Sequence, residues 1–137
     1  MIVLVDTDVL IDLALDRAPY SDRASGLFDA LESRLGTGFV AWHSISNFYY
    51  LVAPSRGRES ARTLLVDLAK FIEVSPTTTE SLLFAAGLNM KDFEDAMQVA
   101  AAAACRADVI ATRNLRDYAK APVRAARPEA IVDELQS

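Results

Sequence analysis

The stretch Met1-Ile-Val-Leu-Val-Asp-Thr-Asp-Val-Leu-Ile-Asp12 decides the fold class that the sequence predicts. Residues 2–5 are an unbroken aliphatic run, which is typical of a strand buried on both faces of a parallel sheet. Asp6 and Asp8 follow at the carboxyl end of this strand. Ligands of open α/β sheets bind at that end, and carboxylates there can hold a hard cation such as Mg²⁺. Asp is also common where a strand turns into a helix, which is the alternative interpretation of Asp8.

Composition limits the class of protein. The 137 residues fit one domain spanning 1–137, and 52% hydrophobic with 24% charged residues predicts a folded, soluble protein. The net charge of −5 excludes a protein that binds nucleic acid by overall charge alone. One cysteine permits no internal disulfide, so we expect a cytoplasmic protein. The apolar runs are too short for a signal peptide or a membrane span.

Strand and helix patterns alternate along the rest of the chain. We expect further strands at 39–42, 71–74 and 109–112 and a short edge strand from Val123, with Gly36–Gly38 as a turn. We expect a third helix that ends at Pro54–Gly57 and an alanine-rich helix from Asp92 to Arg106. This alternation predicts an α/β fold with a mainly parallel sheet flanked by helices.

Three acidic sites converge at the carboxyl edge of this sheet if the first and fourth strands are neighbours. They are Asp6 with Asp8, Asp92 with Asp95, and Asn114 with Asp117 after the strand that ends at Thr112. Asp92 alone is explained as a helix N-cap. Asp95 precedes a helix with small apolar residues almost all round, so it should be enclosed. Several enclosed carboxylates repel one another unless a cation joins them, so the spacing predicts a metal cluster.

The sequence resembles the PIN domain family, and within it the VapC-like toxins of toxin–antitoxin modules. The resemblance covers nearly the whole chain and rests on five motifs: Val5-Asp-Thr-Asp-Val-Leu-Ile-Asp12, Arg17-Ala-Pro-Tyr20, Ser46-Asn-Phe-Tyr-Tyr50, Asp92-Phe-Glu-Asp-Ala-Met-Gln98 and Thr112-Arg-Asn-Leu-Arg-Asp-Tyr118. It implies a three-layer sandwich with about five parallel strands and a Mg²⁺- or Mn²⁺-dependent ribonuclease. It also implies a homodimer and a small antitoxin as partner.

Motif matching carries the family's site onto this chain. The resemblance implies catalytic roles for Asp6, Asp95, Asn114 and Asp117, with the three aspartates as metal ligands. Asp8, Asn47, Asp92 and Thr112 would support them. Two positions depart from the family, because many members carry Glu at position 47 and Asp at position 114. Asparagine can ligate through its carbonyl oxygen but brings no charge, so a PIN fold that has lost catalysis and only binds RNA or protein remains an alternative.

Other expectations concern the substrate and a second enzyme class. Arg113 and Arg116 flank the acidic site and are expected to hold RNA phosphates. The only histidine, His43, is expected to have a local packing or capping role. The motif Val3-Leu-Val-Asp-Thr-Asp8 also fits a haloacid-dehalogenase-type phosphohydrolase with Asp6 as nucleophile. That family's later lysine and Gly-Asp pair are not evident. The apolar third and fourth helices favour a homodimer, because so small a domain cannot bury all their side chains.

Overall fold

The computed structural model describes residues 1–137, in which strands and helices alternate. The strands β1 (Ile2–Val5), β2 (Thr37–Val40), β3 (Ile72–Val74), β4 (Val109–Ala111) and β5 (Ala125–Ala126) form one sheet in the order β3-β2-β1-β4-β5. All four pairings are parallel. The prediction of a mainly parallel sheet of about five strands is therefore confirmed, and β1 lies next to β4 as convergence of the acidic sites requires.

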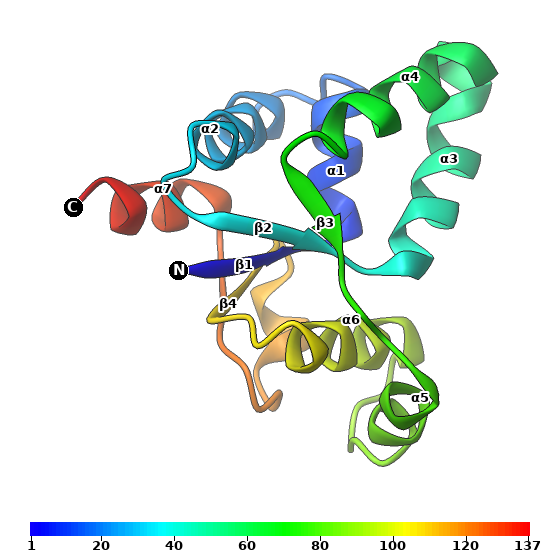
Figure 1. Ribbon diagram of the computed structural model, residues 1–137, viewed down its shortest axis with the longest axis vertical. Coiled ribbons are helices and arrows are strands. Elements are labelled where there is room, and N and C mark those ends of the chain that lie inside the picture. The colour runs from blue at the N-terminus through cyan, green and yellow to red at the C-terminus, as the bar shows by residue number, and fades with distance from the viewer.

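Helices cover both faces of the sheet, which gives three layers (Figure 1). One layer holds α1 (Thr7–Ala14), α2 (Tyr20–Glu32), α3 (Trp42–Arg56) and α4 (Arg58–Leu68), with α7 (Pro128–Gln136) packed against α2. The other holds α5 (Thr79–Ala86) and α6 (Phe93–Ala104). The short 3₁₀ helix η1 (Leu115–Tyr118) follows β4. None of these helices combines the length and the apolar composition that a membrane crossing requires.

The core explains why β1 is an unbroken aliphatic run. Val3 and Val5 point into the larger hydrophobic cluster, shared with α1, α2 and α3. Leu4 points to the opposite face and packs with Val99 and the alanines of α6. All three side chains are fully buried. Burial of both faces fixes β1 at the centre of the sheet, so the residue that follows it emerges in the middle of the carboxyl edge.

The second strand lies two residues earlier than the sequence predicts. β2 occupies Thr37–Val40, so the predicted turn at Gly36–Gly38 is wrong and Trp42 begins α3. Gly38 pairs with Val3 on one side and Ile72 on the other. A Cβ atom there would lie 3.0 Å from Leu31 Cδ1, so this glycine serves close packing rather than a turn. The third helix ends within the predicted segment Pro54–Gly57, because α3 continues through Pro54 to Arg56 and is capped by Gly57, whose φ is 88°.

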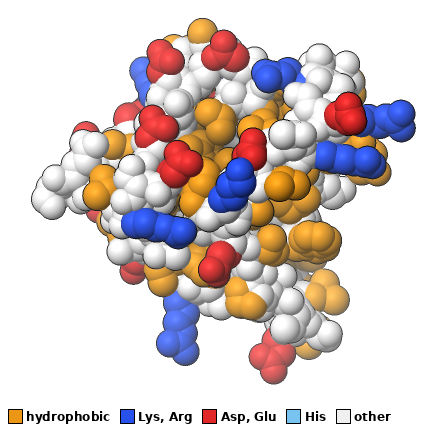
Figure 2. All heavy atoms as spheres, turned by 45° about the horizontal axis from the view of Figure 1, so that its top comes forward, with side chains coloured by type: hydrophobic (Ala, Val, Ile, Leu, Met, Phe, Trp, Pro, Cys, Tyr) orange, Lys and Arg blue, Asp and Glu red, His pale blue; other side chains and the backbone are white.

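The third helix divides its aromatic side chains between core and surface. Phe48 is fully buried, whereas Trp42 and Tyr50 are 68% and 73% exposed. These two residues line a shallow apolar hollow together with Ile45, Tyr49 and Leu65 of α4. Figure 2 shows the resulting concentration of hydrophobic side chains on the right of the face that carries α3 and α4. The chain therefore leaves a sizeable apolar surface uncovered on this side.

Candidate active site

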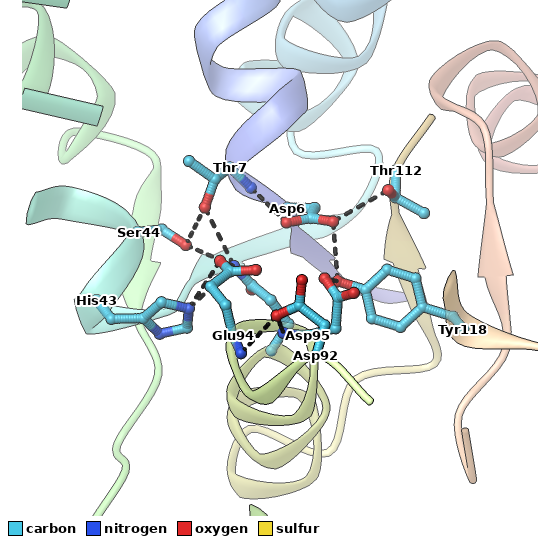
Figure 3. A network of polar contacts seen from close by, with 10 residues as sticks. Asp6, Thr7, His43, Ser44, Asp92, Glu94, Asp95, Thr112 and Tyr118 are labelled. Atoms are coloured by element: carbon cyan, nitrogen blue, oxygen red, sulfur yellow. Dashed lines mark hydrogen bonds and ion pairs between the residues drawn. The ribbon is translucent and has the colours of Figure 1, made fainter. Parts of the chain in front are cut away.

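Asp6 lies where β1 passes into α1. It is the extended N-cap of α1, and its Oδ1 accepts a hydrogen bond from the Thr7 N–H at 2.7 Å. Its Oδ2 accepts from Thr112 Oγ1 at 3.0 Å and from the Tyr118 hydroxyl at 2.9 Å (Figure 3). The residue is only 5% exposed. Burial, and next the charge of Asp8, raise the pKa of this carboxyl to about 7.

Asp95 reaches the same place from the first turn of α6. Asp92 caps this helix, with its Oδ1 accepting from the Glu94 N–H at 2.8 Å and the Asp95 N–H at 3.4 Å. The Oδ1 atom of Asp95 lies 3.3 Å from the Tyr118 hydroxyl. Burial, and next the charges of Asp92 and Glu94, raise the pKa of the Asp95 carboxyl to about 7. One carboxylate oxygen each from Asp92, Glu94 and Asp95 lie within 4.8 Å of one another.

The buried Tyr118 joins the two ends of the site. Its hydroxyl contacts both Asp6 and Asp95, as Figure 3 shows. Burial, and next the charges of these two carboxylates, raise the pKa of the phenol beyond its ordinary range, so the hydroxyl keeps its proton. A hydroxyl has one hydrogen, so Tyr118 donates to only one carboxylate at a time. The second contact is satisfied when the other carboxyl carries a proton, which agrees with the raised pKa of both acids.

Asp8 adds a third carboxylate from the first turn of α1. Its Oδ2 accepts from the Arg113 N–H at 3.0 Å and from Asn114 Nδ2 at 3.3 Å, and it lies 3.3 Å from Thr112 Oγ1, whose one hydrogen is shared with Asp6. Its Oδ1 is buried and has no partner. Burial raises the pKa of the Asp8 carboxyl as well. An unpartnered buried carboxylate oxygen is costly, and a nearby cation would relieve the cost.

A polar network holds α6 against α1 and α3. The Glu94 carboxylate lies 3.1 Å from His43 Nε2 and 3.2 Å from Gln98 Nε2. The hydrogen bond from His43 is the main cause that lowers the pKa of Glu94. The fully buried Gln98 amide also lies 2.8 Å from Ser44 Oγ and 3.2 Å from Thr7 Oγ1. This network fixes the helix start that carries Asp95 relative to the helix start that carries Asp6.

The structure brings some predicted residues together and leaves others at the edge. Asp6, Asp95 and Thr112 meet in the buried centre, and Asp92 acts as the cap that presents Asp95. Asp117 is exposed, and its charge contributes to the raised pKa of Asp95. Asn114 is exposed and reaches Asp8, whereas the half-buried Asn47 makes no side-chain hydrogen bond.

The two predicted phosphate-binding arginines differ in their surroundings. The Arg113 guanidinium forms an ion pair with Asp12, whose side chain is 1% exposed. Arg116 is exposed. The charge of Arg116 is therefore available to bind a phosphate, whereas the charge of Arg113 is already paired with Asp12.

Sequence reasoning missed four residues of the site. Tyr118 closes a motif that the sequence singles out, but its two partners lie 112 and 23 residues away. His43 contacts Glu94 at a separation of 51 residues, so the prediction of a local role for it is wrong. The spacing of Glu94 and Gln98 at i and i+4 is a signal that could have placed both on one helical face.

A family model described as a PIN domain matches residues 2–116. The chain belongs to the PIN domain family. No curated protein sequence matches it significantly. VapBC2 from Rickettsia felis, solved bound to a DNA fragment from its promoter, has a TM-score of 0.70 at 15% identity, over 93% of this chain and 98% of that chain. FitAcB from Neisseria gonorrhoeae has a TM-score of 0.62 at 18% identity, over 92% and 97%. At these identities the likeness shows a shared fold.

The acid cluster of this PIN domain, which consists of Asp6, Asp8 and Asp95, has the chemistry of a divalent cation site. Its donors are carboxylate oxygens, which suit a hard cation such as Mg²⁺ or Mn²⁺. Asp6 and Asp95 are held at the centre, and Asp8 offers an oxygen without a partner. Burial raises the pKa of all three carboxyls, the charges of neighbouring acids add to this effect, and a bound cation would offset both. The residues present therefore fit a metal centre.

Proposed function

We propose that this protein is a Mg²⁺- or Mn²⁺-dependent endoribonuclease. The observation that carries the proposal is the meeting of Asp6 and Asp95 on one buried hydroxyl, with the pKa of both raised to about 7. Perturbed carboxylates that converge at the carboxyl edge of a parallel sheet favour a functional site over a structural one. Membership of the PIN family supports the same assignment. Membership of this family also argues against the haloacid-dehalogenase-type phosphohydrolase, in which Asp6 would be a covalent nucleophile.

Each side chain has a defined task in this proposal. Asp6 and Asp95 would hold the cation, and Asp117 would hold it directly or through water. A bound divalent cation lowers the pKa of a bound water and neutralises charge on the attacked phosphate. Thr112 and Tyr118 hold the Asp6 carboxylate in place by hydrogen bonds. Asn114, at the open edge, orients a water or a phosphate oxygen.

The central prediction concerns the two buried aspartates. Asp6→Asn and Asp95→Asn should each reduce metal-dependent RNA cleavage by more than the ~100-fold that loss of an outer-shell partner costs, because each removes a ligand charge. Cleavage of a labelled RNA with Mg²⁺ and Mn²⁺ measures this, and circular dichroism confirms the fold. Asp29→Asn, an exposed change on α2, is the matched control. Wild-type cleavage by either site variant would contradict the assignment.

A binding module without catalysis is the second candidate function. It is favoured by the neutral residues Asn47 and Asn114 at positions where many family members carry acids. The two candidates differ in metal binding. Titration calorimetry with Mn²⁺ should give a binding signal for the nuclease that Asp6→Asn removes, whereas a degenerate module should give none. In that case the variants Asn47→Glu and Asn114→Asp, which restore acids, would be expected to create metal-dependent RNA cleavage.

We further infer that the nuclease is the toxin of a toxin–antitoxin module. The likeness in fold to VapBC2 over nearly the full length of both chains supports this. A small antitoxin would block the site with a basic side chain that compensates the carboxylates in place of the cation. Expression of the chain alone should arrest growth, and both co-expression of its genomic neighbour and Asp6→Asn should relieve the arrest. Robust cleavage in vitro without any growth arrest would contradict the toxin role and indicate a housekeeping nuclease.

A further inference from the structure

A polar hollow lies beside the acid cluster. Its volume is about 370 Å³, and it opens between α1, α2, the start of η1 and the start of α7. Its lining is almost entirely polar and consists of Asp12, Tyr20, Arg23, Arg113, Asn114, Arg127, Pro128 and Glu129. Three arginines thus face two acids, which reverses the sign of charge found at the acid cluster. Concave basic surfaces of this kind suit anions.

Arg113 is the fixed part of this hollow. Its Nη2 donates to Asp12 Oδ1 at 3.1 Å and its Nε donates to Asp12 Oδ2, which forms a two-pronged ion pair. The guanidinium carbon lies 4.1 Å from the centre of the Tyr20 ring, so the group is also stacked. A guanidinium has five N–H donors, and this pair uses two of them. The rest remain available, in an orientation that the ion pair and the ring fix in advance.

Arg23 and Arg127 supply positive charge that the acids of the hollow neutralise only in part. Arg23 and Arg127 are exposed and form no ion pair. Asp12 is already compensated by Arg113, so Glu129 is the remaining acid against these two cations. Arg127 is also the N-cap residue of α7 and makes no capping hydrogen bond with its side chain. The positive end of the α7 dipole therefore adds to the two charges.

The hollow and the acid cluster share a border. Asp8 accepts hydrogen bonds from the backbone N–H of Arg113 and from the side chain of Asn114, and both residues also line the hollow. An RNA backbone with one phosphate bound at the acid cluster through a cation can therefore continue past Asn114, so that its next phosphate reaches the arginines. Guanidinium forks match phosphate oxygens, and phosphate contacts of this kind position a nucleic acid without reading its sequence.

We propose that this hollow binds a backbone phosphate of the single-stranded RNA substrate, next to the phosphate at the acid cluster. The inference rests on the proposed nuclease function for the identity of the polyanion. It commits Arg23 and Arg127 to phosphate contact and Arg113 to contact through its unused donors. Because the acidic chain as a whole repels RNA, this local basic surface determines where the substrate lies.

Binding measured without metal separates this site from cleavage. The double variant Arg23→Gln/Arg127→Gln is compared with wild type and with Arg58→Gln/Arg62→Gln, which removes the same charge from exposed positions of α4. The probe is a fluorescein-labelled single-stranded oligouridine in EDTA, followed by anisotropy over a series of salt concentrations. The hollow variant should bind at least about tenfold more weakly. Its log–log salt slope should fall by about 1.4, or about 0.7 for each phosphate that an arginine no longer neutralises. The α4 variant should keep the wild-type slope.

The outcomes are distinct from those of the proposed function. Equal losses of affinity in both double variants, or no loss in the hollow variant, would overturn the inference even if wild type cleaves RNA. Absence of RNA binding by wild type would also overturn the inference. An acidic protein segment would then be the expected ligand of the hollow. Selective loss of binding in the hollow variant of a protein that cleaves no RNA would support the inference and refute the nuclease.

Discussion

Protons define the acid site at the scale of single residues. Asp6 and Asp95 have pKa values of about 7, against an ordinary value of 3.8, and one phenol hydroxyl stands between them. At neutral pH the cluster therefore retains protons that a metal ion must displace. Metal binding should release protons and should strengthen as the pH rises through about 7. The neighbouring Glu94 stays ionised, because its contact with His43 lowers its pKa.

The same shifts predict how stability depends on pH without metal. A carboxyl whose pKa is higher in the folded than in the unfolded state binds its proton more tightly in the folded state. Its contribution to the free energy of unfolding therefore falls as the pH rises from about 4 to about 7, and stays low above that. Asp6→Asn removes this loss and keeps an N-cap side chain. In EDTA it should raise the melting temperature well above pH 7 and much less well below it.

The measurement is the difference in melting temperature between Asp6→Asn and wild type across the pH range. Asp29→Asn, at an exposed position on α2, should give a difference near zero at every pH. A difference for Asp6→Asn that does not grow with pH would show that ionising this carboxyl does not destabilise the folded protein. Mn²⁺ should reverse the order above pH 7, because it stabilises wild type through the ligand that the variant lacks.

At the scale of secondary-structure elements, the sequence predicts strands better than their ends. The run Ile2–Val5 predicts a central strand because burial of both faces leaves no polar position. The predicted start of β2 is wrong because Gly38 is interpreted as a turn residue. In the structure Gly38 is a strand residue that packs against Leu31. The sequence predicts that Asp6 and Asp95 lie close together, because one follows a strand and the other lies in the first turn of a helix; both contact Tyr118. The contacts of Tyr118 and His43 depend on packing between distant elements, which no local pattern encodes.

Gly38 of β2 and Gly26 of α2 differ in the space around them, and a substitution at each tests this difference. A side chain at Gly38 would meet Leu31 Cδ1 at 3.0 Å and Ile72 Cγ1 at 3.3 Å, so Gly38→Val should lower the free energy of unfolding by about 2 kcal/mol. Gly26 lies inside α2 with open space around it. Gly26→Ala should raise the free energy of unfolding by about 0.5–1 kcal/mol. Urea unfolding measures both, and a stabilising Gly38→Val would refute the packing explanation.

At the scale of the whole molecule, the uncovered apolar surface favours self-association. Trp42 and Tyr50 are exposed beside a hollow that α3 and α4 line. We predict a homodimer through this surface, because large exposed apolar patches mark protein–protein interaction sites. Light scattering should give the dimer mass at micromolar concentration. Trp42→Glu/Tyr50→Glu should give the monomer, whereas Leu35→Glu, at an exposed position between α2 and β2, should not. A monomer mass for wild type would contradict the prediction.

The central place of β1 also governs when the acid site can exist during synthesis of the chain. Asp6 is made early, yet its partner Tyr118 follows 112 residues later, and the strand that covers the free edge of β1 is β4. At the usual elongation rate of about 5–20 residues per second, about 6 to 22 s separate the two. We therefore expect a nascent chain to acquire the proposed nuclease site only after β4 has paired with β1 and Tyr118 has been added.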